Sequence, residues 1–150
     1  MKARYGRHFP PHRFIYERNI MKWQIDSDRP VYKQLIEQTE QAIVSGIFSP
    51  GERLPSVRDL AAEAGVNPNT MQRALAELER SGILYSQRTS GRFITDDKEM
   101  IDNMKYQKAE DEARNFLANM KKLGLSADDV ARLLAVLVQE ENDEKSTRNE

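Results

Sequence analysis

The fold is decided by residues Leu54 to Gly82, which read LPSVRDLAAEAGVNPNTMQRALAELERSG. Ser56 is a residue type that caps helix starts, and Gly65 supplies the left-handed backbone conformation that ends a helix. Asn67 followed by Pro68 marks a second start, because proline is tolerated at the first position of a helix. The stretch therefore predicts two short helices joined by a tight turn.

The second of these helices is predicted to have an apolar face and a polar face. Four apolar residues recur at helical spacing and are expected to point into the core, namely Met71, Ala74, Leu75 and Leu78. The opposite face carries Asn69, Gln72, Arg73 and Arg80. Amide and arginine side chains pair with adenine and guanine edges in a major groove, and recognition helices use their N-terminal residues for this. We interpret this face as a DNA-reading surface; the alternative is the solvated face of a helical hairpin.

The residues around this pair of helices predict a winged helix-turn-helix. A first helix is predicted from Pro30 to Gly46, and a β-hairpin follows Gly82, with strands at 83–87 and 92–95. The inner face of the first helix is assigned to Tyr32, Leu35, Ile36, Ile43 and Val44. We expect Ile47 and Phe48 to pack onto the core and Arg53-Leu54 to add a short strand. The basic hairpin tip would contact phosphate or a minor groove; an ordinary solvated turn is the alternative.

Two more helices are predicted after the hairpin, from Met100 to Leu123 and from a cap at Ser126 to about Glu141, with residues 142–150 frayed. The run from Val130 to Val138 is apolar on nearly every face, so it needs cover on two sides. We expect the neighbouring helix to supply one cover and a second copy of the chain the other. The residues assigned to this dimerisation are Phe116, Leu117, Met120, Val130, Leu133, Leu134 and Leu137.

Composition limits what this 150-residue chain can be. No apolar run approaches the roughly 20 residues of a membrane span, and the lack of cysteine excludes disulfides and thiolate metal sites. The net charge of −1 combines +4 over residues 1–21, zero over 22–95 and −5 over 96–150. Phosphate binding must therefore come from a local face. No nucleophile–base pair or glycine-rich phosphate loop appears, so neither an enzyme nor a cofactor is expected, and we expect a cytoplasmic protein.

Residues 1–20 show no amphipathic period. His8 and His12 are four residues apart, but Pro10 and Pro11 between them forbid the helix that would align them as metal ligands, so no metal site is expected. We expect residues 1–20 to be a disordered leader or a mis-annotated start upstream of Met21. A basic arm that reaches into a DNA groove is the alternative.

The stretch from Pro30 to Ile94 resembles the N-terminal domain of GntR-family bacterial transcription factors. The matching pieces are PVYKQLIEQTEQAIVSGIFSPGERLPSVRDLA, GVNPNTMQRALAELERSGIL and SGRFI. The short tail of two helices is similar to the YtrA-type branch of that family, where such a tail serves dimerisation. The resemblance implies a mainly α (α+β) fold, with a winged helix-turn-helix domain at 21–95 and a two-helix dimerisation domain at 96–150.

The resemblance also assigns roles to individual residues. Arg58 matches an arginine that contacts DNA from the second helix, and Gly91 matches the wing glycine. Pro68 stands where some members place a contacting arginine, which shifts base contact to Arg58, Gln72 and Arg73. The complete set assigned to DNA binding is Ser56, Arg58, Asn67, Asn69, Thr70, Gln72, Arg73, Arg88, Gly91 and Arg92.

The function expected from these residues is that of a homodimeric DNA-binding regulator in bacteria, and a repressor in particular, that recognises an inverted-repeat operator in double-stranded DNA. The alternative is a winged-helix adaptor that docks a partner protein and does not bind DNA sequence-specifically. The sequence leaves open whether a small-molecule effector exists and which operator is bound.

Overall fold

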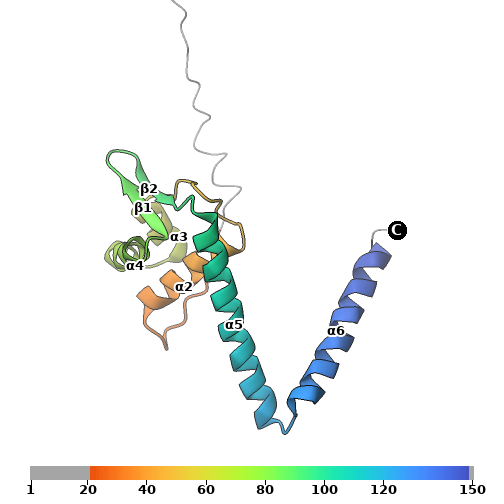
Figure 1. The fold of residues 1–150 in the computed structure, drawn as a ribbon. Coiled ribbons are helices and arrows are strands. Elements are labelled where there is room, and N and C mark those ends of the chain that lie inside the picture. Colours follow the sequence, from red (N-terminus) through yellow and green to blue (C-terminus); the bar gives the residue numbers. More distant parts are fainter. Residues whose placement is uncertain (1–20, 149–150) are drawn as a thin grey trace, which may run out of the picture. The chain divides into compact units, whose positions relative to one another are not determined.

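The computed structural model describes residues 21–148, so the expectations for the leader at residues 1–20 lie outside the described residues (Figure 1). The chain divides into two compact units, Met1–Met104 and Lys105–Glu150. Within residues 21–104 the first unit contains three complete helices, the start of a fourth and a two-stranded sheet. The second contains most of one long helix and all of another.

The three helices of the first unit are α2 (Val31–Val44), α3 (Val57–Ala64) and α4 (Pro68–Arg80). The predicted caps of α3 and α4 are confirmed. Ser56 Oγ accepts the N–H of Asp59 at 3.1 Å, and Asn67 Oδ1 accepts the N–H of Asn69 at 2.8 Å. Gly65 follows α3 with φ 67°, in the left-handed region. Local capping therefore explains why the chain turns between α3 and α4.

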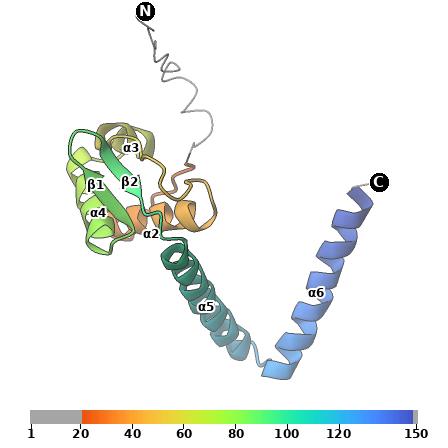
Figure 2. The same ribbon diagram turned by 45° about the horizontal axis from the view of Figure 1, so that its top comes forward.

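The hairpin consists of β1 (Leu84–Gln87) and β2 (Gly91–Ile94), which pair antiparallel with Leu84 opposite Ile94. Tyr85 and Phe93 face each other across the strands, and their rings stack with centroids 5.6 Å apart. The expected short strand is an isolated bridge between Arg53 and Phe93. Both ribbon views show the hairpin beside α4, as in a winged helix (Figures 1 and 2).

The core of the first unit contains most of the apolar residues that the sequence patterns select. Met71, Ala74, Leu75 and Leu78 of α4 are all buried. Phe48 is also buried as expected, but the expectation for Ile47 is wrong, since its side chain is 42% exposed. Gln34 is buried although it is polar, and hydrophobic periodicity passes over it because it selects only apolar residues.

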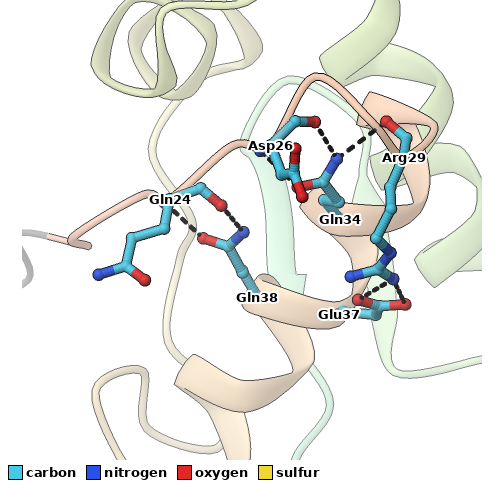
Figure 3. Close-up of polar contacts among 6 residues, drawn as sticks. All are labelled: Gln24, Asp26, Arg29, Gln34, Glu37 and Gln38. Carbon is cyan, nitrogen blue, oxygen red and sulfur yellow. Dashed lines mark hydrogen bonds and ion pairs between the residues drawn. The ribbon is translucent and has the colours of Figure 1, made fainter.

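Gln34 is buried because its side chain binds the segment that leads into α2 (Figure 3). Its Oε1 accepts the N–H of Asp26 at 2.7 Å, while its Nε2 donates to the carbonyl oxygens of Asp26 at 2.6 Å and Arg29 at 2.9 Å. Gln38 makes the same kind of two-way contact with the backbone of Gln24, at 2.9 and 2.7 Å. Two glutamine side chains therefore supply hydrogen-bond partners for the backbone of residues 24–29, as a neighbouring β-strand would.

The long helices are α5 (Lys98–Lys122) and α6 (Ala127–Arg148). The start of α5 belongs to the first unit, where Ile101 is buried and Met100 and Met104 pack against the core. The α6 cap is confirmed, since Ser126 Oγ accepts the N–H of Asp129 at 3.2 Å and Asp129 Oδ2 accepts the N–H of Ser126 at 2.9 Å.

The expectation that α6 ends near Glu141 is wrong, because the helix continues to Arg148. Its last turns carry local contacts that support the helix. Gln139 Nε2 donates to Asp143 Oδ1 at 2.9 Å, and Lys145 Nζ lies 3.9 Å from Glu141 Oε2. Polar composition alone therefore does not end this helix, since contacts between residues four apart stabilise it.

The expectation that α5 covers one side of the apolar run on α6 is also wrong. Residues 131–148 are all exposed, including Leu133 at 41%, Leu134 at 41% and Leu137 at 46%. Val130, by contrast, is already buried within the chain at 2% exposure, so it has little surface left for a partner. Of the α5 residues assigned to dimerisation, Leu117 is exposed at 48%, while Phe116 and Met120 are half-buried.

None of the helices within residues 21–148 combines the length and the hydropathy that crossing a bilayer requires.

Candidate nucleic-acid interface

The candidate interface is centred on the first two turns of α4. The inner face of the helix is anchored by four buried apolar residues, so its outer face is held in a fixed orientation. On that outer face Asn67, Asn69, Gln72 and Arg73 are exposed, and Thr70 is half-buried. The structure thus brings the predicted residues of α4 together on an accessible surface.

Arg73 rests on an aromatic ring from another helix. Its Cζ lies 3.7 Å from the ring centroid of Tyr32 in the first turn of α2. This contact fixes an exposed cationic side chain by a cation–π interaction. The sequence patterns assign Tyr32 to the inner face of α2, and they miss its contact with Arg73 because the two residues lie far apart in the chain.

Arg92 connects the wing to α4. Its Nε donates to Glu79 Oε2 at 3.3 Å, and its Nη1 lies 3.5 Å from Gln72 Oε1, at the long limit of a hydrogen bond. The side chain of Arg92 is only 18% exposed. The pKa of the Glu79 carboxyl is lowered, chiefly by a hydrogen bond from Ser86 and then by Arg92, against the opposing effect of burial. Strand β2 is therefore held to the recognition helix by an ion pair.

The tip of the wing combines a free cation with an unusual backbone. Arg88 is exposed, and Thr89 has φ 71°, in a region that β-branched residues rarely adopt. Gly91 has φ 100°, and a Cβ built on it would lie 3.2 Å from Nε of Arg53. Arg53 therefore places its side chain beside the tip end of the wing, where the sequence patterns predict only a short strand.

The second helix contributes Ser56 and Arg58. Ser56 uses its oxygen as the acceptor of the α3 cap, which leaves its hydroxyl hydrogen free to donate. Arg58 is exposed. Across residues 21–148, no hydrogen bond or ion pair engages the side chains of Arg53, Arg58, Arg73 or Arg88. Within residues 21–148, four arginines thus keep all their hydrogen-bond donors available.

Arg80 differs from these four arginines. Its Nη1 donates to both carboxylate oxygens of Glu77, at 2.7 and 2.8 Å. Glu77 precedes it by one turn of α4, so the pair is a local surface ion pair of small energetic weight. The available cations of the α4 surface are therefore confined to its N-terminal half, where Arg73 lies.

Comparison with known proteins identifies the family of the chain. Residues 31–94 match the family described as bacterial regulatory proteins, gntR family. The chain is 37% identical over 107 residues to the HTH-type transcriptional regulator YhcF of Bacillus subtilis, which covers 71% of this chain and 88% of YhcF. It is 45% identical over 75 residues to the HTH-type transcriptional repressor YtrA of Bacillus subtilis, which covers 49% of this chain and 58% of YtrA.

A solved structure supports the same assignment. A GntR family transcriptional regulator from Listeria monocytogenes superposes with a TM-score of 0.70 at 37% identity, which covers 74% of this chain and 97% of that one. This match extends beyond the winged helix, because residues 31–94 make up less than the 74% of the chain that the structural match covers. The chain therefore belongs to the GntR family and is a transcriptional regulator with a winged helix-turn-helix DNA-binding domain, not an enzyme.

Proposed function

We propose that this regulator is a homodimeric repressor that binds an inverted-repeat operator through α4 and the wing. The observation that carries the proposal is the outer face of α4, where amide and arginine donors are exposed on a helix whose other face is buried. Such donors match the acceptor groups on purine edges in a major groove. A protein that acts on the bacterial chromosome in this way works in the cytoplasm.

The geometry supports a division of labour among the assigned residues. Gln72 and Arg73 lie on the exposed face of the recognition helix, and with Arg58 they would read bases. Phosphates would be held by Ser56, Asn67, Thr70 and Arg88, whereas Arg92, which pairs with Glu79 and is only 18% exposed, would position the wing against α4. Ser56 and Asn67 could cap their helices and bind phosphate together, because the cap uses an oxygen as acceptor and leaves an O–H or N–H to donate.

The dimer is proposed from the apolar surface of α6. Leu133, Leu134 and Leu137 are exposed at 41%, 41% and 46%, and Val136 and Val138 at 56% and 57%. Water-exposed apolar surface of this extent on one helix is typical of an interaction site. A second copy of the chain fits it, because a two-fold dimer places the same helix face against itself. Two recognition helices could then enter successive major grooves about 34 Å apart.

The role of repressor is proposed from similarity to YtrA, whose name gives that role. Binding over a promoter would block RNA polymerase. The rival function, a protein–protein adaptor, would use the α6 surface for a different partner and would not require free arginine donors on α4 and the wing.

The experiment that tests the proposal is selection of bound sequences from a random DNA duplex pool by the full chain at near-physiological salt. We expect enrichment of an inverted repeat with half-sites about one helical turn apart. The variant Arg73→Ala should lose about 1–3 kcal/mol of binding free energy and relax one base position. Salt-sensitive weak binding without any enriched sequence would contradict the proposal and favour the adaptor.

A further inference from the structure

Tyr32 lies outside the residues assigned to DNA binding, yet it meets one of them directly. It is in the first turn of α2, and its ring lies 3.7 Å from Cζ of Arg73 on α4. Tyr32 is half-buried while Arg73 is exposed. The guanidinium group of Arg73 therefore packs on the Tyr32 ring and remains exposed to solvent.

The ring holds the arginine without using any of its hydrogen-bond donors. A guanidinium carries five N–H donors in its plane, and stacking on an aromatic face leaves that edge free. Ion pairing has the opposite effect, because Arg80 and Arg92 donate to the carboxylates of Glu77 and Glu79. Arg73 thus combines a restrained side chain with a free donor edge.

Restraint of this kind matters for base readout. A free arginine on the protein surface loses rotamer freedom when it binds, and it can reach a phosphate as easily as a base. A guanidinium that is already held in place loses less rotamer freedom on binding. It can also present two parallel donors to guanine O6 and N7. The contact with Tyr32 therefore favours base discrimination more than overall affinity.

We infer that Tyr32 is a positioning residue for specificity: it orients Arg73 so that the guanidinium edge reads a guanine in the operator. The inference rests on the proposed function, because Arg73 has to contact operator DNA. It adds a residue of α2 to the specificity-determining set, and it assigns that residue to one base pair of each half-site.

The test measures binding of the full chain to the selected operator and to a series in which each base pair is replaced in turn. The base pair read by Arg73 is the one whose preference Arg73→Ala relaxes. We expect Tyr32→Leu to reduce the preference for guanine at that base pair by about two- to fivefold, the strength of an exposed cation–π contact. Tyr32→Phe keeps an aromatic face and should retain the preference.

Two controls separate positioning from general damage. In an Arg73→Ala background, Tyr32→Leu should have no further effect on base preference, because the residue through which it acts is gone. Arg80→Ala removes a cation from the same helix and should leave the preference for guanine unchanged. Thermal unfolding of Tyr32→Leu and Tyr32→Phe then shows whether a loss of stability accompanies the change.

Each remaining outcome overturns the inference. A uniform loss of affinity for every operator variant in Tyr32→Leu would make Tyr32 a structural residue or a phosphate contact. Equal losses in Tyr32→Phe and Tyr32→Leu would assign the effect to the hydroxyl. If the base preferences of the operator survive Arg73→Ala, the role of Tyr32 is wrong but the proposed function stands. If the wild-type chain selects no operator, both the role of Tyr32 and the proposed function are wrong.

Discussion

At the residue scale, the buried amide of Gln34 determines how the chain enters the first helix. Its side chain makes three hydrogen bonds to the backbone of Asp26 and Arg29 (Figure 3). Gln38 makes two with Gln24, in a more exposed position. A substitution at Gln34 leaves backbone groups without partners in a place that is partly shielded from water, whereas water can replace the bonds of Gln38.

We expect Gln34→Leu to lower the free energy of unfolding by about 1–3 kcal/mol, the cost of leaving buried polar groups unsatisfied. The matched control Gln38→Leu should lower the free energy of unfolding by clearly less. Urea unfolding followed by circular dichroism measures both. Equal losses in the two variants would show that burial of the amide is not what stabilises the segment.

Glu79 makes the stability of the wing depend on pH. Its pKa is lowered by the hydrogen bond from Ser86 and by Arg92. A carboxyl with a lowered folded-state pKa stabilises the fold above its ordinary pKa of about 4.3, and this contribution is lost as the pH falls through the lowered value.

Glu79→Gln should therefore reduce stability at neutral pH and flatten the decline of unfolding free energy on acidification below about pH 4. Thermal unfolding between pH 7 and pH 3 measures this slope. Glu63→Gln makes the same change of charge at an exposed position of α3 and serves as the control. If both variants follow the acid decline of the wild type, the ion pair with Arg92 does not contribute to stability.

At the scale of elements, the turn between α3 and α4 depends on the backbone of Gly65. Its φ of 67° is left-handed, and a Cβ built there meets nothing within 4 Å. Any effect of a side chain at this position is therefore conformational and not a clash.

We expect Gly65→Ala to destabilise the chain by about 1–2 kcal/mol, the usual penalty for a left-handed L-residue. Gly65→Asn should lose less, because asparagine tolerates this conformation. Chemical unfolding midpoints of the two variants give the comparison. An alanine variant as stable as the wild type would mean that the turn adopts another backbone conformation.

At the scale of the whole molecule, the apolar surface of α6 is left exposed to water in the single chain. Residues 131–138 are exposed, and no part of the chain within residues 21–148 buries them. Dimerisation through this surface would also strengthen operator binding, because two linked recognition helices bind far more tightly than one.

The double variant Leu134→Glu, Leu137→Glu should sediment as a monomer, whereas the wild-type chain should sediment as a dimer, because burying two carboxylates in an apolar interface is strongly unfavourable. Affinity for the inverted repeat should fall by about 100-fold. Asn142→Glu adds a charge at an exposed polar position of the same helix and should stay dimeric. A wild-type monomer in analytical ultracentrifugation would contradict the dimer.

The helix caps and the two faces of α4 can be predicted from local sequence alone. The caps at Ser56, Asn67 and Ser126 depend on hydrogen bonds within three residues, and the buried face of α4 depends on helical spacing. The exposure of the residues on the outer face of α4 follows from the same spacing. Interactions this short in sequence can be recognised without knowing the fold.

The contact partners of these side chains depend on how separate elements pack against one another. Arg73 lies on Tyr32, Arg92 pairs with Glu79, and the amide of Gln34 is buried against a backbone segment. Each contact joins residues from separate elements or from a helix and the segment before it, so residue spacing carries no signal for it. The exposure of α6 is likewise a property of what packs on the helix, and a pattern of apolar residues indicates only that cover is needed.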